Sequence, residues 1–236
     1  MNIPNELLNR IVYFLSLKSV AKFSTVLNVY SLATDEIKKL CDGCDLLYAV
    51  RNHNSLTLTK LVLLHNKCDV NKGFTFQNMT ALQFASYNDN FEIVKALVNA
   101  GANVNHRERY YGITALDWAT KKEIIKFLLN VDGIDVNIAD YENHATKLHC
   151  VCAENTCDKE IVELLINRGA DINKRNKLGE TALYLASFKG HEDIVELLIN
   201  RGADISILDN NGKSYLDVKP TQNSLFHKIS KMFSSE

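Results

Sequence analysis

The sequence predicts an all-α fold, in which helix–turn–helix repeats stack into a solenoid behind a small helical segment at the N-terminus. The main observation is a duplication: the twelve residues IVELLINRGADI occupy positions 161–172 and recur unchanged at 194–205, an offset of 194 − 161 = 33. A self-match of this length at a fixed offset is typical of repeat proteins. The second observation is that only two prolines occur, Pro4 and Pro220, so the long middle section is free to form successive helices.

The duplicated stretch has the pattern of an amphipathic helix. Ile161, Leu164 and Leu165 lie at i, i+3 and i+4, which places them on one face. Gly169 follows the apolar pattern, at the position where a left-handed residue commonly ends a helix. One such helix cannot bury its apolar face alone, whereas a neighbouring copy can cover it.

Composition excludes several classes of function. The 236 residues are 46% hydrophobic and carry a formal net charge of −1, which is ordinary for a soluble globular protein. Near-neutral charge argues against nucleic-acid and membrane-surface binding, and no apolar run is long enough to span a bilayer. The N-terminus lacks the basic and apolar regions of a signal peptide. Six cysteines in a chain of this size do not suggest a secreted disulfide framework, so we expect a cytoplasmic protein.

Residues 1–41 do not follow the repeat. Pro4 is well placed at a helix start, and apolar residues follow at helical spacing through two short helices. With Pro4, these positions are Ile3, Leu7, Leu8, Ile11, Phe14, Leu15, Val20, Phe23 and Val26. In order and spacing the segment resembles an F-box, although Ser16, Leu27 and Tyr30 stand where that family usually has proline, cysteine and tryptophan.

The F-box resemblance implies that these ten residues dock on the Skp-type adaptor of a cullin–RING ubiquitin ligase. The alternative is that the helices of residues 1–41 only cap the exposed face of the first repeat, as a solenoid requires.

Repeat positions continue beyond the duplicated stretch. First helices start at Thr80, Thr114, Thr146, Thr181 and Ser214, in steps of 34, 32, 35 and 33 residues. Each start has a Thr-Ala-Leu-type pattern, and a Gly-Ala-Asp-Val-Asn-type turn closes each unit. These motifs and this period resemble ankyrin repeats, which implies helix pairs joined by β-hairpin-like turns.

The ankyrin register divides the rest of the chain into six units. We expect a degenerate repeat at 45–71, repeats at 75–105, 109–137, 141–173 and 176–206, and a partial C-terminal repeat or cap at 209–236. The repeat at 109–137 is three residues short between its two helices, because Thr114 to Ile124 spans 10 residues where Thr80 to Ile93 spans 13. Thr146 to Ile161 spans 15, so the next repeat carries an insertion.

The ankyrin resemblance implies a concave groove, formed by turn tips and first helices, that holds a target protein. Large apolar and basic residues occupy groove positions where the fold would accept small polar ones. They are Phe76, Met79, Tyr87, Tyr110, Tyr111, Ile113, Lys121, Lys177, Leu178, Phe188 and Lys189. The alternative is that some of these side chains pack onto neighbouring tips.

Catalytic chemistry has little support in the sequence. Cys41 and Cys44 have zinc-ligand spacing, but a closed site needs four ligands, and the cluster around His149 is distant in sequence. The chain lacks a glycine-rich phosphate loop, a Gly-x-Ser-x-Gly elbow and a His-Glu-x-x-His motif. We therefore expect no catalytic residues, no metal and no cofactor, and rank an enzyme last.

These expectations combine into a non-enzymatic adaptor. The N-terminal segment would dock on the ligase adaptor while the ankyrin groove holds a target for ubiquitin transfer. Proteins of this kind occur in eukaryotes and among effectors of intracellular bacteria and large DNA viruses, which would act in the host cytosol. Outside its complex we expect a monomer. The rival is an ankyrin scaffold or inhibitor without a ligase connection.

Overall fold

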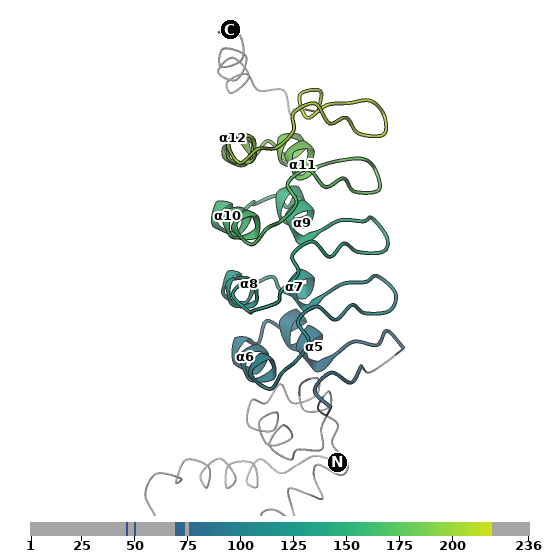
Figure 1. Ribbon diagram of the computed structural model, residues 1–236, viewed down its shortest axis with the longest axis vertical. Coiled ribbons are helices and arrows are strands. Elements are labelled where there is room, and N and C mark those ends of the chain that lie inside the picture. Colours follow the sequence, from purple (N-terminus) through teal and green to yellow (C-terminus); the bar gives the residue numbers. More distant parts are fainter. Residues whose placement is uncertain (1–45, 47–49, 51–68, 74–75, 219–236) are drawn as a thin grey trace, which may run out of the picture. The chain divides into compact units, whose positions relative to one another are not determined.

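The computed structural model describes residues 46, 50, 69–73 and 76–218 (Figure 1). The F-box-like segment, most of the degenerate repeat and the C-terminal residues 219–236 lie outside this part of the chain. The described residues fall into two compact units. One contains residues 80–102 together with the described residues before 74, and the other contains 76–79 and 103–218.

Each unit is built from helix pairs. The smaller unit contains α5 (Ala81–Tyr87) and α6 (Phe91–Asn99). The larger unit contains α7 (Ala115–Trp118), α8 (Lys122–Leu129), α9 (Lys147–Ala153), α10 (Lys159–Asn167), α11 (Ala182–Lys189) and α12 (Glu192–Asn200). In the larger unit α7, α9 and α11 form one layer, α8, α10 and α12 form a second, and the turns project beside the first layer (Figure 1). The all-α prediction is confirmed for the described residues, in which an isolated β-bridge joins Ala139 to Thr146.

Threonine caps the first helix of each repeat. The Thr114 hydroxyl accepts the N–H of Asp117, and the Asp117 carboxylate accepts the N–H of Thr114 at 2.9 Å. Gln83 bonds back to Thr80 in the same way in the smaller unit, so the pattern is a capping box. Thr181 accepts the N–H of Tyr184. These capping bonds, reciprocal at Thr80 and Thr114, explain why the helices begin where the sequence pattern predicts.

The duplicated stretch forms α10 and α12 and supplies the core between the layers. Ile161, Leu165, Ile194 and Leu198 are each at most 2% exposed. Gly169, just after α10, has φ of 85°, the left-handed conformation expected of a residue that ends a helix. Packing therefore accounts for the buried apolar positions that the two copies share.

The short spacing in the repeat at 109–137 shortens α7 to four residues. Its end is stabilised from the next repeat by Lys147, which is 5% exposed. The Lys147 ammonium donates to the carbonyls of Asp117, at 3.2 Å, and Ala119, at 3.0 Å. A deleted helical turn leaves such carbonyls without intrahelical donors, so the buried lysine compensates for the deletion.

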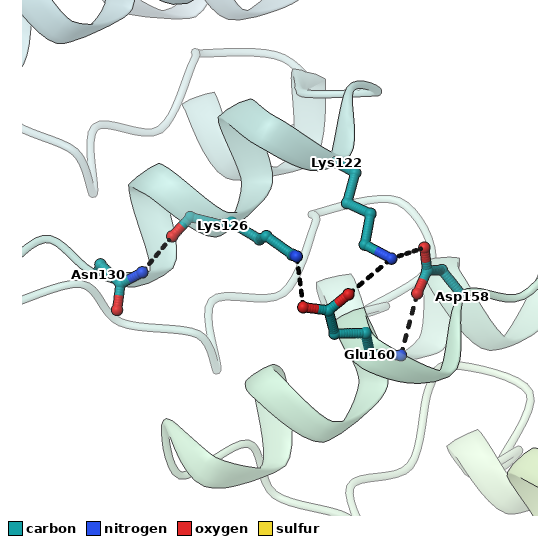
Figure 2. Close-up of polar contacts among 5 residues, drawn as sticks. All are labelled: Lys122, Lys126, Asn130, Asp158 and Glu160. Atoms are coloured by element: carbon teal, nitrogen blue, oxygen red, sulfur yellow. Dashed lines mark hydrogen bonds and ion pairs between the residues drawn. The ribbon is translucent and has the colours of Figure 1, made fainter.

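An exposed ion-pair network joins α8 to α10. Lys122 lies 2.7 Å from the Asp158 carboxylate and 2.8 Å from that of Glu160, and Lys126 pairs with Glu160 from the next turn of α8 (Figure 2). The hydrogen bonds from Lys122 and Lys126 lower the pKa of Glu160 to about 2. Because these side chains are well exposed, the network contributes little to stability and mainly orients the two helices.

Acidification is expected to destabilise the fold through His149, which is 1% exposed. Its Nδ1 accepts the Thr146 N–H at 3.2 Å, so its Nε2 carries the proton and donates to the Lys174 carbonyl at 2.9 Å. Burial lowers the pKa of His149 below 6.5, so the unfolded chain takes up a proton at a higher pH than the folded chain. The stability that the neutral ring contributes is therefore complete above the unfolded pKa and falls as pH drops through it.

The variant His149→Gln tests this pH dependence. Gln83 already fills the equivalent place beside Thr80, so glutamine can keep the capping bond without titrating. Urea unfolding from pH 8 to pH 5 should show a smaller loss of stability in the variant than in the unmodified chain. Parallel curves for the two proteins would contradict the role given to His149.

Candidate protein-binding surface

Three carboxylates and one amide, all buried or partly buried, close the projecting turns of the larger unit. Glu108 is 1% exposed and accepts the backbone N–H groups of Tyr110, at 2.8 Å, and Tyr111. Asp140, Asn176 and Asp209 close the following turns in the same way. The N–H of Lys213 is the main cause of the lowered pKa of Asp209. Each turn is thus fixed by its own side chain.

Successive turns are also bonded to one another through the backbone. The N–H of Arg109 donates to the carbonyl of Gln77 at 2.7 Å, and that of Tyr141 to Tyr111 at 2.7 Å. The N–H of Lys177 donates to Asn143 at 2.8 Å, and that of Asn210 to Leu178 at 2.9 Å. We call residues 76–79, 107–113, 139–145, 175–180 and 208–213 the tip row. This ladder makes the tip row one connected surface with fixed spacing.

Large apolar side chains are exposed along the tip row. Phe76 is 90% exposed, Leu178 is 61% exposed, and Tyr110 and Tyr111 are 57% and 47% exposed. These positions were expected at the groove from the sequence. Exposed aromatic and aliphatic groups on a rigid backbone are the usual anchors of protein–protein contacts.

Sequence reasoning missed Tyr141, which is also half exposed in the tip row. The Arg107 guanidinium lies over its ring at 4.1 Å from the centroid and also donates to the Gly112 carbonyl. The stacking fixes the ring in one orientation. Its position in the sequence could have indicated this exposure, because Tyr141 directly follows Asp140, the residue that closes this turn.

The remaining predicted groove positions lie at or near the ends of first helices. Phe188 and Lys189 are exposed at the end of α11, and the Lys189 ammonium donates to Asn155 Oδ1 at 3.1 Å. Asn155 belongs to the insertion, so the insertion contacts this basic residue. Lys121 is exposed before α8. Tyr87 is 58% exposed at the end of α5 in the smaller unit.

Two residues that were predicted to line the groove have side chains that are buried or partly buried. Met79 is 6% exposed, which contradicts its expected place on the surface, and Ile113 is partly buried. Each directly precedes a helix-capping threonine, Thr80 or Thr114. The chain turns inward there to begin the helix, so an apolar side chain at this position faces the interior.

Cys152 lacks the environment of a reactive or metal-binding thiol. A hydrogen bond with Cys157, followed by burial, raises the pKa of Cys152 well above its ordinary value. The protonated thiol is a poor nucleophile and metal ligand. Among the described residues, no three His, Cys, Asp or Glu side chains are grouped so that they could hold a metal ion. Cys41 and Cys44 lie outside those residues.

Within the described part of the chain, the helices are all too short or too polar to cross a membrane.

Comparisons with known proteins agree with the repeat architecture. The sequence model of a family described as ankyrin repeats, in three copies, matches residues 46–140 and 141–218. An ankyrin repeat protein of Rickettsia bellii is 33% identical over 143 residues, covering 58% of this chain and 77% of that protein. The human ankyrin repeat and SOCS box protein 6 is 31% identical over 133 residues, which are 53% of this chain but only 31% of that protein.

Solved structures show the same fold. A crystal structure of an ankyrin repeat protein superposes with a TM-score of 0.67 and 27% identity, covering 80% of this chain and 96% of the other. A chain from the complex of a Bdellovibrio bacteriovorus predatory endopeptidase with an immunity protein gives a TM-score of 0.63 and 28% identity. That match covers 73% of this chain and 89% of the other.

Proposed function

Because the chain belongs to the ankyrin-repeat family, whose members are generally binding modules without catalytic activity, we propose that it is a non-enzymatic adaptor that holds a target protein on its tip row. The observation that carries this proposal is the exposure of Phe76, Tyr110, Tyr111 and Leu178 on a hydrogen-bonded backbone ladder. Such side chains cost solubility and add nothing to the core, so binding is their best explanation.

Replacing Tyr111 with alanine is expected to change the free energy of unfolding by less than about 0.5 kcal/mol, because the ring is half exposed. The same change should weaken binding of target proteins, as truncation of an aromatic anchor does. The measurements are thermal unfolding and the amounts of protein captured by the variant and by the unmodified chain.

Two control variants are compared with Tyr111→Ala. Tyr184→Ala removes a side chain that is 8% exposed and donates to Asp209 at 3.0 Å, so it should lower the melting temperature clearly. Lys159→Ala, on α10 away from the tip row, should leave capture unchanged. If Tyr111→Ala lowers the melting temperature as much as Tyr184→Ala does, Tyr111 is a packing residue instead.

We further propose that the adaptor serves a Skp/cullin/F-box-type ubiquitin ligase through residues 1–41. The support is the order of residues in that segment, from Ile3 and Pro4 to Val26. The family match begins at residue 46 and does not include it. Two binding sites on one chain would raise the local concentration of the target at the ligase.

A pull-down of the chain with a purified Skp-type adaptor subunit tests the ligase proposal. The unmodified chain should form a complex, and the double variant Pro4→Ala, Leu8→Ala should lose it while still capturing the tip-row target. Absence of a complex with the unmodified chain, or a double variant that changes only thermal stability, would leave residues 1–41 as a cap.

The second candidate function is an inhibitor or scaffold without a ligase. The observation that favours it is the similarity to a chain from the endopeptidase–immunity protein complex. In either function the relatives in Rickettsia bellii and in Fowlpox virus, the latter 31% identical over 117 residues, suit an effector of an intracellular bacterium or a large DNA virus.

A further inference from the structure

Charge is distributed unevenly between the inside and the outside of the tip row. Its carboxylates mostly point inward, because Glu108, Asp140 and Asp209 are occupied as acceptors of backbone N–H groups that close the turns. Glu180 is partly buried and accepts a bond from Asn176 at 2.8 Å. Within the tip row, Glu142 is the one carboxylate residue that is exposed.

Four of the five Lys and Arg residues of the tip row are exposed instead, and the fifth, Arg107, is partly buried. Arg109, Arg175, Lys177 and Lys213 all lie at the surface. Among the exposed residues of the tip row the formal charge is therefore 4 − 1 = +3. Over the whole tip row five Lys/Arg and five Asp/Glu residues cancel, so its distinguishing feature is that mainly the cations, and not the carboxylates, face the solvent.

We infer that the tip row binds an acidic, extended polypeptide segment of its target, with carboxylates beside the exposed cations and apolar side chains on the exposed rings and Leu178. This inference rests on the proposed protein-binding function and adds the chemical class of the partner. At contact the exposed cations pair with the carboxylates of the segment, and the apolar anchors hold it there.

The apolar side chains favour a polypeptide over a nucleic acid. Nucleic-acid bases stack on aromatic rings, and the tip row offers those in Tyr110 and Tyr111. Leu178 is an aliphatic group that gives a base no stacking partner, yet it is one of the most exposed residues of the row. A polypeptide with leucine or phenylalanine side chains can use both kinds of contact.

The test is a selection of random peptides, displayed on phage, with the full chain as bait. The enriched peptides should be acidic and contain apolar residues, and their affinity should fall as salt is raised. The double variant Arg109→Glu, Lys177→Glu should bind them at least about tenfold more weakly. Lys159→Glu, the same charge change on α10, should bind them as the unmodified chain does.

The outcomes separate this inference from the function on which it rests. Enriched peptides that are neutral or basic, or that bind the double variant as they bind the unmodified chain, overturn the inference. If Tyr111→Ala still weakens the binding of those peptides, the protein-binding proposal stands. If Tyr111→Ala weakens the binding of no selected peptide, the acidic-segment inference and the protein-binding proposal both fail. Comparable affinity for a polyuridine RNA probe would also overturn the polypeptide assignment. Circular dichroism of each variant shows whether it is folded. The milder double variant Arg109→Gln, Lys177→Gln removes the charges without reversing them, so weaker binding by a folded form of it cannot come from unfolding.

Discussion

Replacing Leu197 with alanine is expected to lower the free energy of unfolding by about 2–5 kcal/mol, the usual cost of truncating a buried leucine. Leu197 lies on α12 and is 7% exposed. Alanine removes its apolar contacts and leaves a cavity that the surrounding helices fill only in part. Urea unfolding followed by circular dichroism measures the loss.

The duplicated sequence provides a matched control for Leu197. Leu164 occupies the same place in α10, within the same twelve residues, but is only partly buried. Leu164→Ala should therefore cost at least about 1 kcal/mol less than Leu197→Ala. Equal losses, or a loss below about 1 kcal/mol for Leu197→Ala, would contradict the burial difference between the two copies.

Replacing Gly179 with alanine is expected to destabilise the tip row by about 2–4 kcal/mol. Gly179 has φ of 81°, where a Cβ atom is strained. That Cβ would also lie 2.8 Å from the backbone nitrogen of Asn210, which donates to the Leu178 carbonyl. The substitution must therefore displace a bond of the ladder as well as strain its own turn.

Gly212 separates these two effects, because it is the equivalent residue of the next turn, 33 positions later. Its φ is 76°, and a Cβ there would meet nothing within 4 Å. Gly212→Ala should thus cost only the backbone strain, about 1–2 kcal/mol. Thermal unfolding of both variants gives the comparison. A Gly212→Ala variant as unstable as Gly179→Ala would mean that the contact with Asn210 is relieved at no cost.

Much of the candidate binding surface could be predicted from the sequence, because the ankyrin register fixes which positions project. Tyr110, Tyr111, Leu178 and Phe188 are exposed as expected. Met79 was predicted wrongly, because register alone does not show on which side of the turn the chain enters the helix. Tyr141 was overlooked, although its exposure follows from the same register.

The compensation for the short helix α7 could not be predicted. The sequence shows the missing residues between Thr114 and Ile124, and separately shows a lysine at 147. Only the stacking of the repeats brings the Lys147 ammonium within hydrogen-bonding distance of the Asp117 and Ala119 carbonyls. A buried lysine is unfavourable unless such acceptors meet it, and sequence spacing does not position acceptors in another repeat.

By itself, the sequence determined the local structure: the helix period, the capping threonines, the glycines that end helices and the repeat to which each residue belongs. These depend on contacts within a few residues of the chain. The tertiary structure alone decided how residues with the same local sequence differ, as Leu164 and Leu197 do in burial. It also decided that the tip row turns its carboxylates inward and its cations outward, because burial and charge exposure depend on neighbours that the chain brings together only when its repeats stack.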